Sequence, residues 1–283
     1  MSFPDRLLRA MADRGPLCVG IDPHSGLLNR WGLPDTVEGL ARFSRTVVEA
    51  LADRVAVLKP QSAFFERFGS AGIAVLESTI RQSRAAGALV LLDVKRSDIG
   101  STAQAYGQAY LDPASPLRAD AITVVPYLGF GSIASILDEA EAHGAGVFVV
   151  ALSSNPEGRE IQHARTADGR TVAQTVIDQV GHRNRAARRL GPAGVVIGAT
   201  VGATPDGVSH DLSRLHGPVL APGLGAQGAK AEDLRVAFEG LDGVLLPSYS
   251  REVLARGPSV TGLRDAAARC LAECRKVVDY PVL

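Results

Sequence analysis

The feature that most constrains the fold of this chain is a regular alternation between apolar, strand-like runs and amphipathic, helix-like stretches. The strand-like runs are Leu17–Asp22, Val55–Lys59, Ala88–Asp93, Ala121–Val125, Gly146–Ser153, Gly194–Thr200, Pro218–Gly223 and Gly243–Pro247. The helix-like stretches are Thr36–Ala52, Gly72–Ala86, Ser101–Tyr110, Ile133–His143, Thr171–Leu190, Pro205–His216, Ala229–Glu239 and Ser259–Val277. Strands that read as continuous apolar runs, each followed by a helix, are typical of a parallel sheet covered by helices.

Eight such units predict an α/β protein with a closed (β/α)8 TIM barrel, for which 283 residues is an ordinary length. The alternative is an open doubly wound sheet, which usually has fewer strands and often a glycine-rich dinucleotide turn after the first. The first run leads into Gly20-Ile21-Asp22-Pro23-His24, which lacks that pattern. No low-complexity linker divides the chain, so we expect residues 1–283 to form a single barrel domain. Its long irregular segment 154–169, after the fifth strand, is expected to be a lid or a binding loop.

Composition excludes several classes of partner. Thirty basic and 30 acidic residues give a formal net charge of zero, which removes the electrostatic argument for nucleic acid or an anionic membrane surface. The apolar runs are far shorter than the roughly 20 residues that span a bilayer. The N-terminus carries charges throughout and has no apolar signal core, so we expect a cytoplasmic protein. Cys18, Cys270 and Cys274 lack paired C-x-x-C spacing and are interpreted as reduced packing residues, and the six histidines lack zinc-ligand spacing.

Polar residues end several of the predicted strands, and in a barrel the carboxyl ends of the strands form the active site. The residues at these ends are Asp22, Lys59, Asp93-Val94-Lys95 and Ser153-Ser154. Asp93 and Lys95 are two positions apart and should share a face, with Asp98 in the following loop. Two carboxylates about 4 Å apart repel by roughly 4 kcal/mol, so a lysine is needed between them. A solvated turn with a salt bridge would explain the Asp-x-Lys-x-x-Asp string alone, but the polar strand ends together favour a site.

A glycine-rich turn follows the seventh predicted strand, in the sequence Ala221-Pro222-Gly223-Leu224-Gly225-Ala226-Gln227-Gly228. Glycines let backbone N–H groups approach an anion closely, and a helix beginning near Ala229 would add its positive end. Arg251 follows the eighth strand and carries a planar guanidinium that suits phosphate oxygens. Because phosphate sites after strands seven and eight recur in barrels, we expect a phosphate site here.

With Asp22, Lys59, the motif Asp93-x-Lys95-x-x-Asp98-Ile99-x-x-Thr102, the glycine turn and Arg251 in this order, the chain resembles the orotidine 5′-phosphate decarboxylase family. The resemblance covers the whole barrel. It is greatest to the longer bacterial subgroup (type 2), in which Leu58-Lys59-Pro60-Gln61 and the glycine turn are characteristic. The D-x-K-x-x-D-I-x-x-T string at a third-strand end is highly specific within barrels.

This resemblance implies the decarboxylation of orotidine 5′-phosphate to uridine 5′-phosphate, the last step of de novo UMP biosynthesis, with no cofactor and no metal. By the resemblance, the charged tetrad comprises Lys59, Asp93, Lys95 and Asp98. Lys95 would protonate a carbanion at C6, and Asp98 would reach into the other subunit's site in a homodimer. The implied substrate-binding residues are Asp22, Ile99, Thr102, Ser154, Gly223, Gly225, Gln227, Gly228 and Arg251. Ser153 is an alternative to Ser154, because both precede Asn155-Pro156.

Three other functions remain as alternatives. A magnesium-dependent sugar-phosphate decarboxylase or epimerase shares the Asp-x-Lys-x-x-Asp frame, but its metal needs a carboxylate where this chain has Lys59. A Schiff-base aldolase needs a neutral lysine, whereas a lysine between carboxylates is held protonated. A non-catalytic nucleotide-phosphate-binding barrel would retain the phosphate site but has no need of the complete tetrad.

Overall fold

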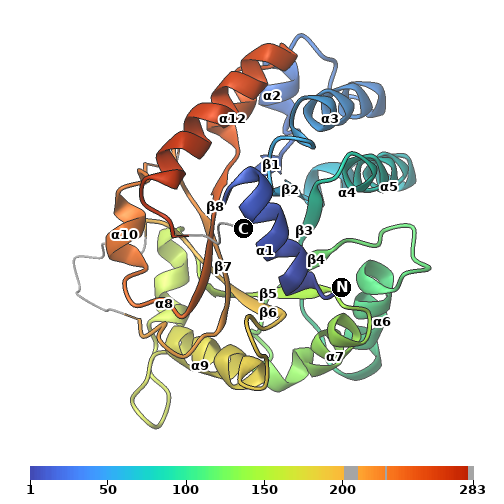
Figure 1. Ribbon diagram of the computed structural model, residues 1–283. Helices are drawn as coiled ribbons and strands as arrows, with labels where there is room; N and C mark the ends of the chain where they lie inside the picture. The colour runs from blue at the N-terminus through green and yellow to red at the C-terminus, as the bar shows by residue number, and fades with distance from the viewer. Residues whose placement is uncertain (201–209, 227, 280–283) are drawn as a thin grey trace.

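The computed structural model describes residues 1–200, 210–226 and 228–279, and they form a closed barrel of parallel strands in sequential order (Figure 1). The strands are β1 (Cys18–Ile21), β2 (Val57–Pro60), β3 (Leu89–Arg96), β4 (Ala121–Val124), β5 (Gly146–Leu152), β6 (Ala193–Ile197), β7 (Gly217–Pro222) and β8 (Gly243–Tyr249). β8 pairs with β1 and closes the barrel. The predicted α/β fold class and the (β/α)8 barrel are therefore confirmed, and each predicted strand contains or overlaps the observed one.

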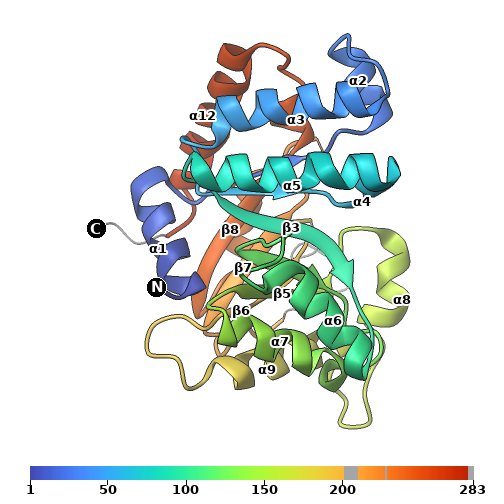
Figure 2. The same ribbon diagram turned by 90° about the vertical axis from the view of Figure 1, so that its right-hand side faces the viewer.

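Helices surround the barrel (Figure 1). They are α1 (Phe3–Arg14), α2 (Ser25–Arg30), α3 (Val37–Leu51), α4 (Ala63–Glu66), α5 (Gly69–Ala85), α6 (Gly100–Leu111), α7 (Ala134–Ala142), α8 (Arg159–Gln162), α9 (Val172–Asn184), α10 (Asp233–Ala237), α11 (Arg251–Leu254) and α12 (Val260–Arg275), with 3-10 turns η1 (Phe130–Ile133) and η2 (Pro156–Gly158). The predicted loop 154–169 thus contains η2 and α8. α8 lies at the end of the barrel toward which β3 points (Figure 2).

The core has two layers because successive strand residues point to opposite sides. Val19, Leu58 and Val90 belong to the cluster shared with the surrounding helices. Cys18, Val57 and Leu91 belong to the second cluster, which fills the barrel. Continuing from these interior residues in steps of two along β2 and β3 leads to Lys59 and Asp93.

The helix α1, which the sequence pattern did not predict, closes the amino-terminal end of the barrel (Figures 1 and 2). Its Phe3, Leu7 and Met11 are part of the interior cluster. Phe3 packs edge-on against Phe148 of β5, with ring centroids 6.1 Å apart. A Cβ at Gly146 would lie 2.3 Å from the Phe3 ring, so this close contact requires glycine. With one end closed, the cavity that can receive a ligand lies at the carboxyl ends of the strands.

Three helix predictions were wrong in their extent. The predicted helix Thr171–Leu190 ends at Asn184, whose buried side-chain amide donates to the carbonyls of Ala193 and Leu215 at 2.7 and 3.0 Å. These bonds turn the chain back toward β6. The predicted helix Pro205–His216 lies partly outside the described residues, and its part at 210–216 is not helical.

The helix predicted to begin near Ala229 begins at Asp233 instead. The intervening residues complete the glycine turn, where Gly225 N–H donates to the Ala229 carbonyl at 2.9 Å and Leu224 forms an isolated bridge with Ala229. The N–H of Lys230 then donates to the Asp233 side chain at 2.7 Å. The five-residue helix α10 therefore does not begin directly at the end of the glycine turn.

The three cysteines are free and buried, as predicted. In the part of the chain that the structure describes, no helix is long and apolar enough to cross a membrane.

Candidate active site

A carboxylate between two ammonium groups lies at the centre of the barrel mouth, which is the opening at the carboxyl ends of the strands. Asp93 Oδ2 lies 3.2 Å from Lys59 Nζ, and Asp93 Oδ1 lies 2.6 Å from Lys95 Nζ. The side chains of Lys59 and Asp93 are 8% and 9% exposed, whereas that of Lys95 is 48% exposed. The predicted neighbours Lys59, Asp93 and Lys95 therefore do converge, with Lys95 as the member that reaches solvent.

Four further contacts hold Asp93 and Lys95 in place. Thr123 Oγ1, on β4, donates to Asp93 Oδ1 at 2.8 Å and accepts from the backbone N–H of Lys95 at 3.0 Å. The carbonyl of Asp93 accepts from Gln61 Nε2 at 3.1 Å and from the backbone N–H of Ser62 at 3.2 Å. Both the carboxylate and the main chain of Asp93 are thereby fixed.

The backbone at Lys95 has φ +46°, in the left-handed region that side-chain-bearing residues rarely adopt. The predicted third strand ended at Asp93, but β3 continues to Arg96 through an irregularity in its pairing with β4. Such strained conformations persist where surrounding contacts over-determine them, and they cluster at functional sites.

The two buried charges stabilise each other. Burial would raise the pKa of Asp93, but the ammonium groups of Lys59 and Lys95 and the Thr123 hydroxyl outweigh it and hold that pKa well below its usual range. Burial would lower the pKa of Lys59, but the carboxylates of Asp93 and Asp22 raise it above its usual value. Both side chains are therefore charged at neutral pH.

A cavity of about 390 Å³ opens beside this cluster at the carboxyl ends of the strands. It is lined by Asp22, His24, Lys59, Gln61, Phe64, Asp93, Pro222, Gly223, Leu224, Ala226, Ser248, Ser250 and Arg251. The cavity thus brings together five predicted site residues, namely Asp22, Lys59, Asp93, Gly223 and Arg251. Asp22 Oδ2 accepts a hydrogen bond from Ser250, while its Oδ1 is buried without a partner among the described residues.

The other predicted residues lie outside this lining. Asp98 accepts a 2.8 Å hydrogen bond from the Ile99 N–H, and the side chain of Ile99 is 62% exposed. Thr102 is exposed on the first turn of α6, and Ser154 is exposed after β5. The hydroxyl of Ser153, in contrast, accepts from Gln162 of α8 at 2.8 Å, and Ser154 is the more exposed of the two serines.

The glycine turn is brought only partly to the cavity. Gly223 and Ala226 line it, with φ +105° at Gly223. The N–H groups of Gly225 and Gly228 donate to carbonyls inside the turn, so they are not free to bind an anion here. Gln227 lies outside the described residues.

Sequence reasoning missed several residues at the mouth. Thr123 is a polar residue in an otherwise apolar strand, a signal that was available in the sequence. His24 accepts from the N–H of Leu27 at the start of α2, and its ring lies 6.1 Å from that of Phe64. Ser250 has no recognisable sequence signal, because its approach to Asp22 depends on the closure of β8 onto β1.

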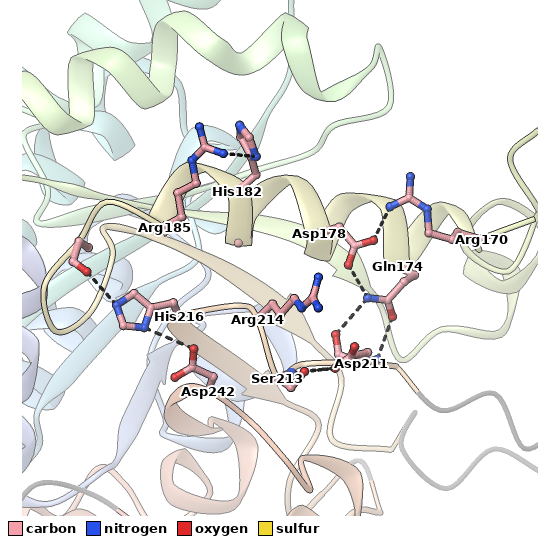
Figure 3. A pocket seen from close by; sticks show the side chains of 12 residues that line it. Arg170, Gln174, Asp178, His182, Arg185, Asp211, Ser213, Arg214, His216 and Asp242 are labelled. Atoms are coloured by element: carbon pink, nitrogen blue, oxygen red, sulfur yellow. Dashed lines mark hydrogen bonds and ion pairs between the residues drawn. The ribbon is translucent and has the colours of Figure 1, made fainter. Parts of the chain in front are cut away.

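A larger groove, of about 870 Å³, lies outside the barrel along α9 (Figure 3). It lies beside residues 211–216, which are not helical although a helix was predicted there. Arg214 projects into it, and His216 Nδ1 lies 3.4 Å from Asp242 Oδ2 (Figure 3). It contains none of the predicted site residues.

The fold and the mouth define a (β/α)8-barrel protein whose site combines a charged acid–base cluster with a neighbouring arginine. A family model described as "Orotidine 5'-phosphate decarboxylase / HUMPS family" matches residues 15–265, and the chain belongs to this family.

Curated proteins and a solved structure that are similar to this chain are named for the same family. A curated protein named orotidine 5′-phosphate decarboxylase from Salinispora tropica is 66% identical over 274 residues, which cover 97% of each chain. One from Streptomyces coelicolor is 57% identical over 98% of each chain. The crystal structure of a putative orotidine 5′-phosphate decarboxylase from Streptomyces avermitilis has a TM-score of 0.92 and 55% identity, and covers 98% of this chain and 95% of that one.

Proposed function

We propose that this chain decarboxylates orotidine 5′-phosphate to uridine 5′-phosphate, with Lys59, Asp93, Lys95 and Asp98 as its charged catalytic groups. The overall reaction rests on membership of the family and on the high identity to relatives named for it over nearly the whole chain. The single structural observation that supports the catalytic roles is the Lys59–Asp93–Lys95 contact at the cavity.

The reaction needs what this cluster supplies. Loss of CO2 from C6 of the pyrimidine leaves a carbanion with no adjacent carbonyl to delocalise it, so the enzyme must stabilise the charge electrostatically. Asp93 remains ionised and would lie against the substrate carboxylate, which disfavours the ground state. Lys95, the exposed end of the cluster, would stabilise the carbanion and then donate a proton to C6.

The remaining lining residues suit the rest of the substrate. The unpartnered Oδ1 of Asp22 and the ammonium of Lys59 would bind the ribose hydroxyls. Arg251 would bind the phosphate together with Gln227 and the glycine turn, and Ser154 would bind the edge of the pyrimidine. Because Gly225 and Gly228 bond internally, phosphate binding through their N–H groups would require the turn to rearrange. The binding energy of the phosphate would drive this rearrangement, and the closed turn would exclude water from the pyrimidine ring.

The proposal includes a homodimer in which Asp98 enters the partner's site. Asp98, Ile99 and Thr102 follow β3 and lie outside the cavity of their own chain. Ile99, Tyr127 and Leu128, in the loops after β3 and β4, are 62%, 72% and 54% exposed. Apolar side chains exposed on neighbouring loops favour a protein interface. In this proposal residues 1–283 act as one barrel domain in the cytoplasm.

The structure gives a physical reason against two of the alternatives. Lys59 occupies a position where a magnesium site would need a carboxylate, and an ammonium 3.2 Å from Asp93 competes with a cation for that oxygen. The raised pKa of Lys59 also keeps it protonated, which makes it a poor Schiff-base nucleophile.

The test of the reaction is the loss of orotidine 5′-phosphate absorbance on adding EDTA-treated protein. Conversion to uridine 5′-phosphate supports the proposal and its independence of a metal. Folded protein without activity, which gains activity on ketose phosphates when magnesium is restored, would favour the sugar-phosphate alternative. Binding of uridine 5′-phosphate without turnover would favour the non-catalytic barrel.

The shared site is tested with mixed variants. Asp98→Ala and Lys95→Ala proteins should each be inactive, and mixing them under subunit exchange should restore activity, because one site of each hybrid dimer carries both native residues. The regained rate should approach a quarter of the wild-type rate per total site at roughly equal mixing, since half of the dimers are hybrids and one of their two sites is intact. No regain despite exchange would contradict the shared site.

A further inference from the structure

Thr123 is the one polar side chain in β4, and it is almost completely buried, at 1% exposure. A hydroxyl has one hydrogen to donate and lone pairs to accept with. Since Thr123 Oγ1 accepts from the backbone N–H of Lys95, its hydrogen is available for Asp93 Oδ1, which accepts it at 2.8 Å. One hydroxyl therefore joins the main chain of one catalytic residue to the carboxylate of the other.

The pairing of β3 with β4 explains why this bond is needed. Leu92 pairs with Ile122, and the next pair is Arg96 with Val124. Three residues of β3, from Asp93 to Lys95, thus lie opposite the single residue Thr123. In such a bulge the extra residues lose their ladder partners. The side chain of Thr123 supplies the acceptor for the Lys95 N–H at the point where φ is +46°.

The Asp93 carboxylate has two oxygens and two cationic neighbours, so its rotation determines which oxygen each lysine contacts. Thr123 donates to the same oxygen that contacts Lys95, while the other oxygen contacts Lys59. Thr123 is the only uncharged side chain that donates to this carboxylate among the described residues, because Gln61 donates to the carbonyl instead. The hydroxyl thus fixes both the carboxylate and the backbone that carries the half-exposed Lys95 side chain.

We infer that Thr123 is a positioning residue for proton delivery: through one hydroxyl it aligns the Asp93 carboxylate with Lys95 and holds Lys95 in its left-handed backbone conformation. This inference rests on the proposed function, in which Lys95 is the proton donor. Thr123 is 1% exposed, whereas the side chain of Lys95 is 48% exposed, so Thr123 acts through Asp93 and Lys95 rather than on the substrate.

The test compares variants that remove or keep the hydroxyl. Thr123→Val should lower kcat for orotidine 5′-phosphate roughly 10- to 100-fold, the loss expected for a buried hydrogen bond to a charged group. KM should change less than roughly threefold, because the ribose and phosphate groups bind elsewhere in the cavity. Thr123→Ser keeps the hydroxyl and should restore most of kcat.

Thr79→Val is the matched control. Thr79 is also buried, at 4% exposure, and its hydroxyl donates to the Val75 carbonyl within α5 at 2.8 Å, away from the mouth. It should leave kcat unchanged even if the melting temperature falls. If Thr123→Val does not fold, Thr123→Ala removes the same hydroxyl and is compared with Thr123→Ser in its place.

Three results would overturn the inference: wild-type kcat in the hydroxyl-free variant, an equal loss in Thr123→Ser, or an equal loss in Thr79→Val. Wild-type turnover, measured first, separates these results from a failure of the proposed function. An inactive wild type refutes the proposed reaction, whereas an active wild type with an equally active Thr123→Val refutes only the role of Thr123.

Discussion

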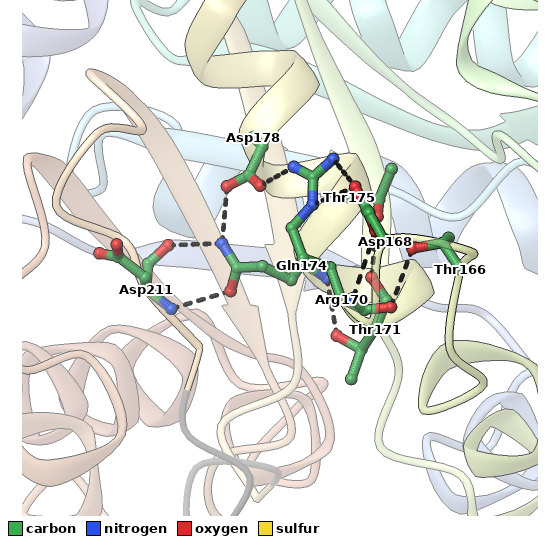
Figure 4. A network of polar contacts seen from close by, with 8 residues as sticks. All are labelled: Thr166, Asp168, Arg170, Thr171, Gln174, Thr175, Asp178 and Asp211. Atoms are coloured by element: carbon green, nitrogen blue, oxygen red, sulfur yellow. Dashed lines mark hydrogen bonds and ion pairs between the residues drawn. The ribbon is translucent and has the colours of Figure 1, made fainter.

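A buried charged cluster at the barrel mouth and an exposed one beside α9 have the same arrangement with opposite signs. At the mouth, the carboxylate of Asp93 lies between the ammonium groups of Lys59 and Lys95. Beside α9, the guanidinium of Arg170 lies between two carboxylates (Figure 4). The side chain of Asp93 is 9% exposed and that of Arg170 is 46% exposed.

The exposed cluster connects the end of the 154–169 loop to α9. Arg170 contacts Asp168 and Asp178, and Gln174 bridges Asp178 to the backbone of Asp211 (Figure 4). Water screens such pairs, so they contribute little to stability. The difference shows that a string of alternating charges does not define a site. The two-residue period of the strand defines the site, because it determines which charged side chains point into the barrel.

The largest expected difference between the clusters is in catalysis. Lys95→Ala should lower kcat by roughly 100- to 10,000-fold, the range for loss of a general acid. The circular dichroism spectrum should show that the protein remains folded. Arg170→Ala should retain the wild-type rate. Normal turnover by Lys95→Ala would show that the proton comes from elsewhere.

The next difference is in stability. Asp93→Asn leaves the buried ammonium of Lys59 without the carboxylate that it contacts, and this should lower the free energy of unfolding by about 3–5 kcal/mol. Asp168→Asn removes a carboxylate from the exposed cluster and should have a much smaller effect. Urea denaturation of both variants measures the comparison, and equal losses would mean that burial does not distinguish the clusters.

The smallest expected effect is in the pH dependence of that stability. The pKa of Asp93 is lowered below 3.8 in the folded protein, so its contribution is present above that pH and lost as the pH falls toward the folded value. The pKa of Lys59 is raised above 10.5, so its contribution is present below that pH and lost at higher pH. The stability difference between wild type and Asp93→Asn should therefore be constant across neutral pH and shrink at both extremes. A difference that changes between pH 6 and 8 would contradict this assignment.

The strand pattern and the central charges could be predicted from the sequence because both follow local periodicity. Lys59 and Asp93 lie on the interior faces of apolar strands, and steps of two are enough to place them. The continuation of β3 to Arg96 could not be predicted in the same way, because it depends on the bulge against β4. Because that pairing could not be predicted, the contacts of Thr123 with Asp93 and Lys95 could not be predicted either.

Elements outside the strands were predicted less well because tertiary contacts determine their ends. Asn184 stops α9 through bonds to residues distant in sequence. The glycine turn extends to Ala229 because its N–H groups bond internally, which delays α10. α1 was missed because it precedes the alternating pattern that identified the other helices.

The position of α1 has a consequence for the order in which this protein acquires its structure. α1 precedes all eight strands in the chain, yet its Phe3 packs on Phe148 of β5. The interior cluster to which Phe3 belongs also includes Leu220 of β7 and Leu246 of β8. During synthesis on the ribosome, the helix emerges long before the surface that it covers exists. The surface that α1 covers is therefore complete only once β8, the last strand, has been synthesised and has joined the barrel.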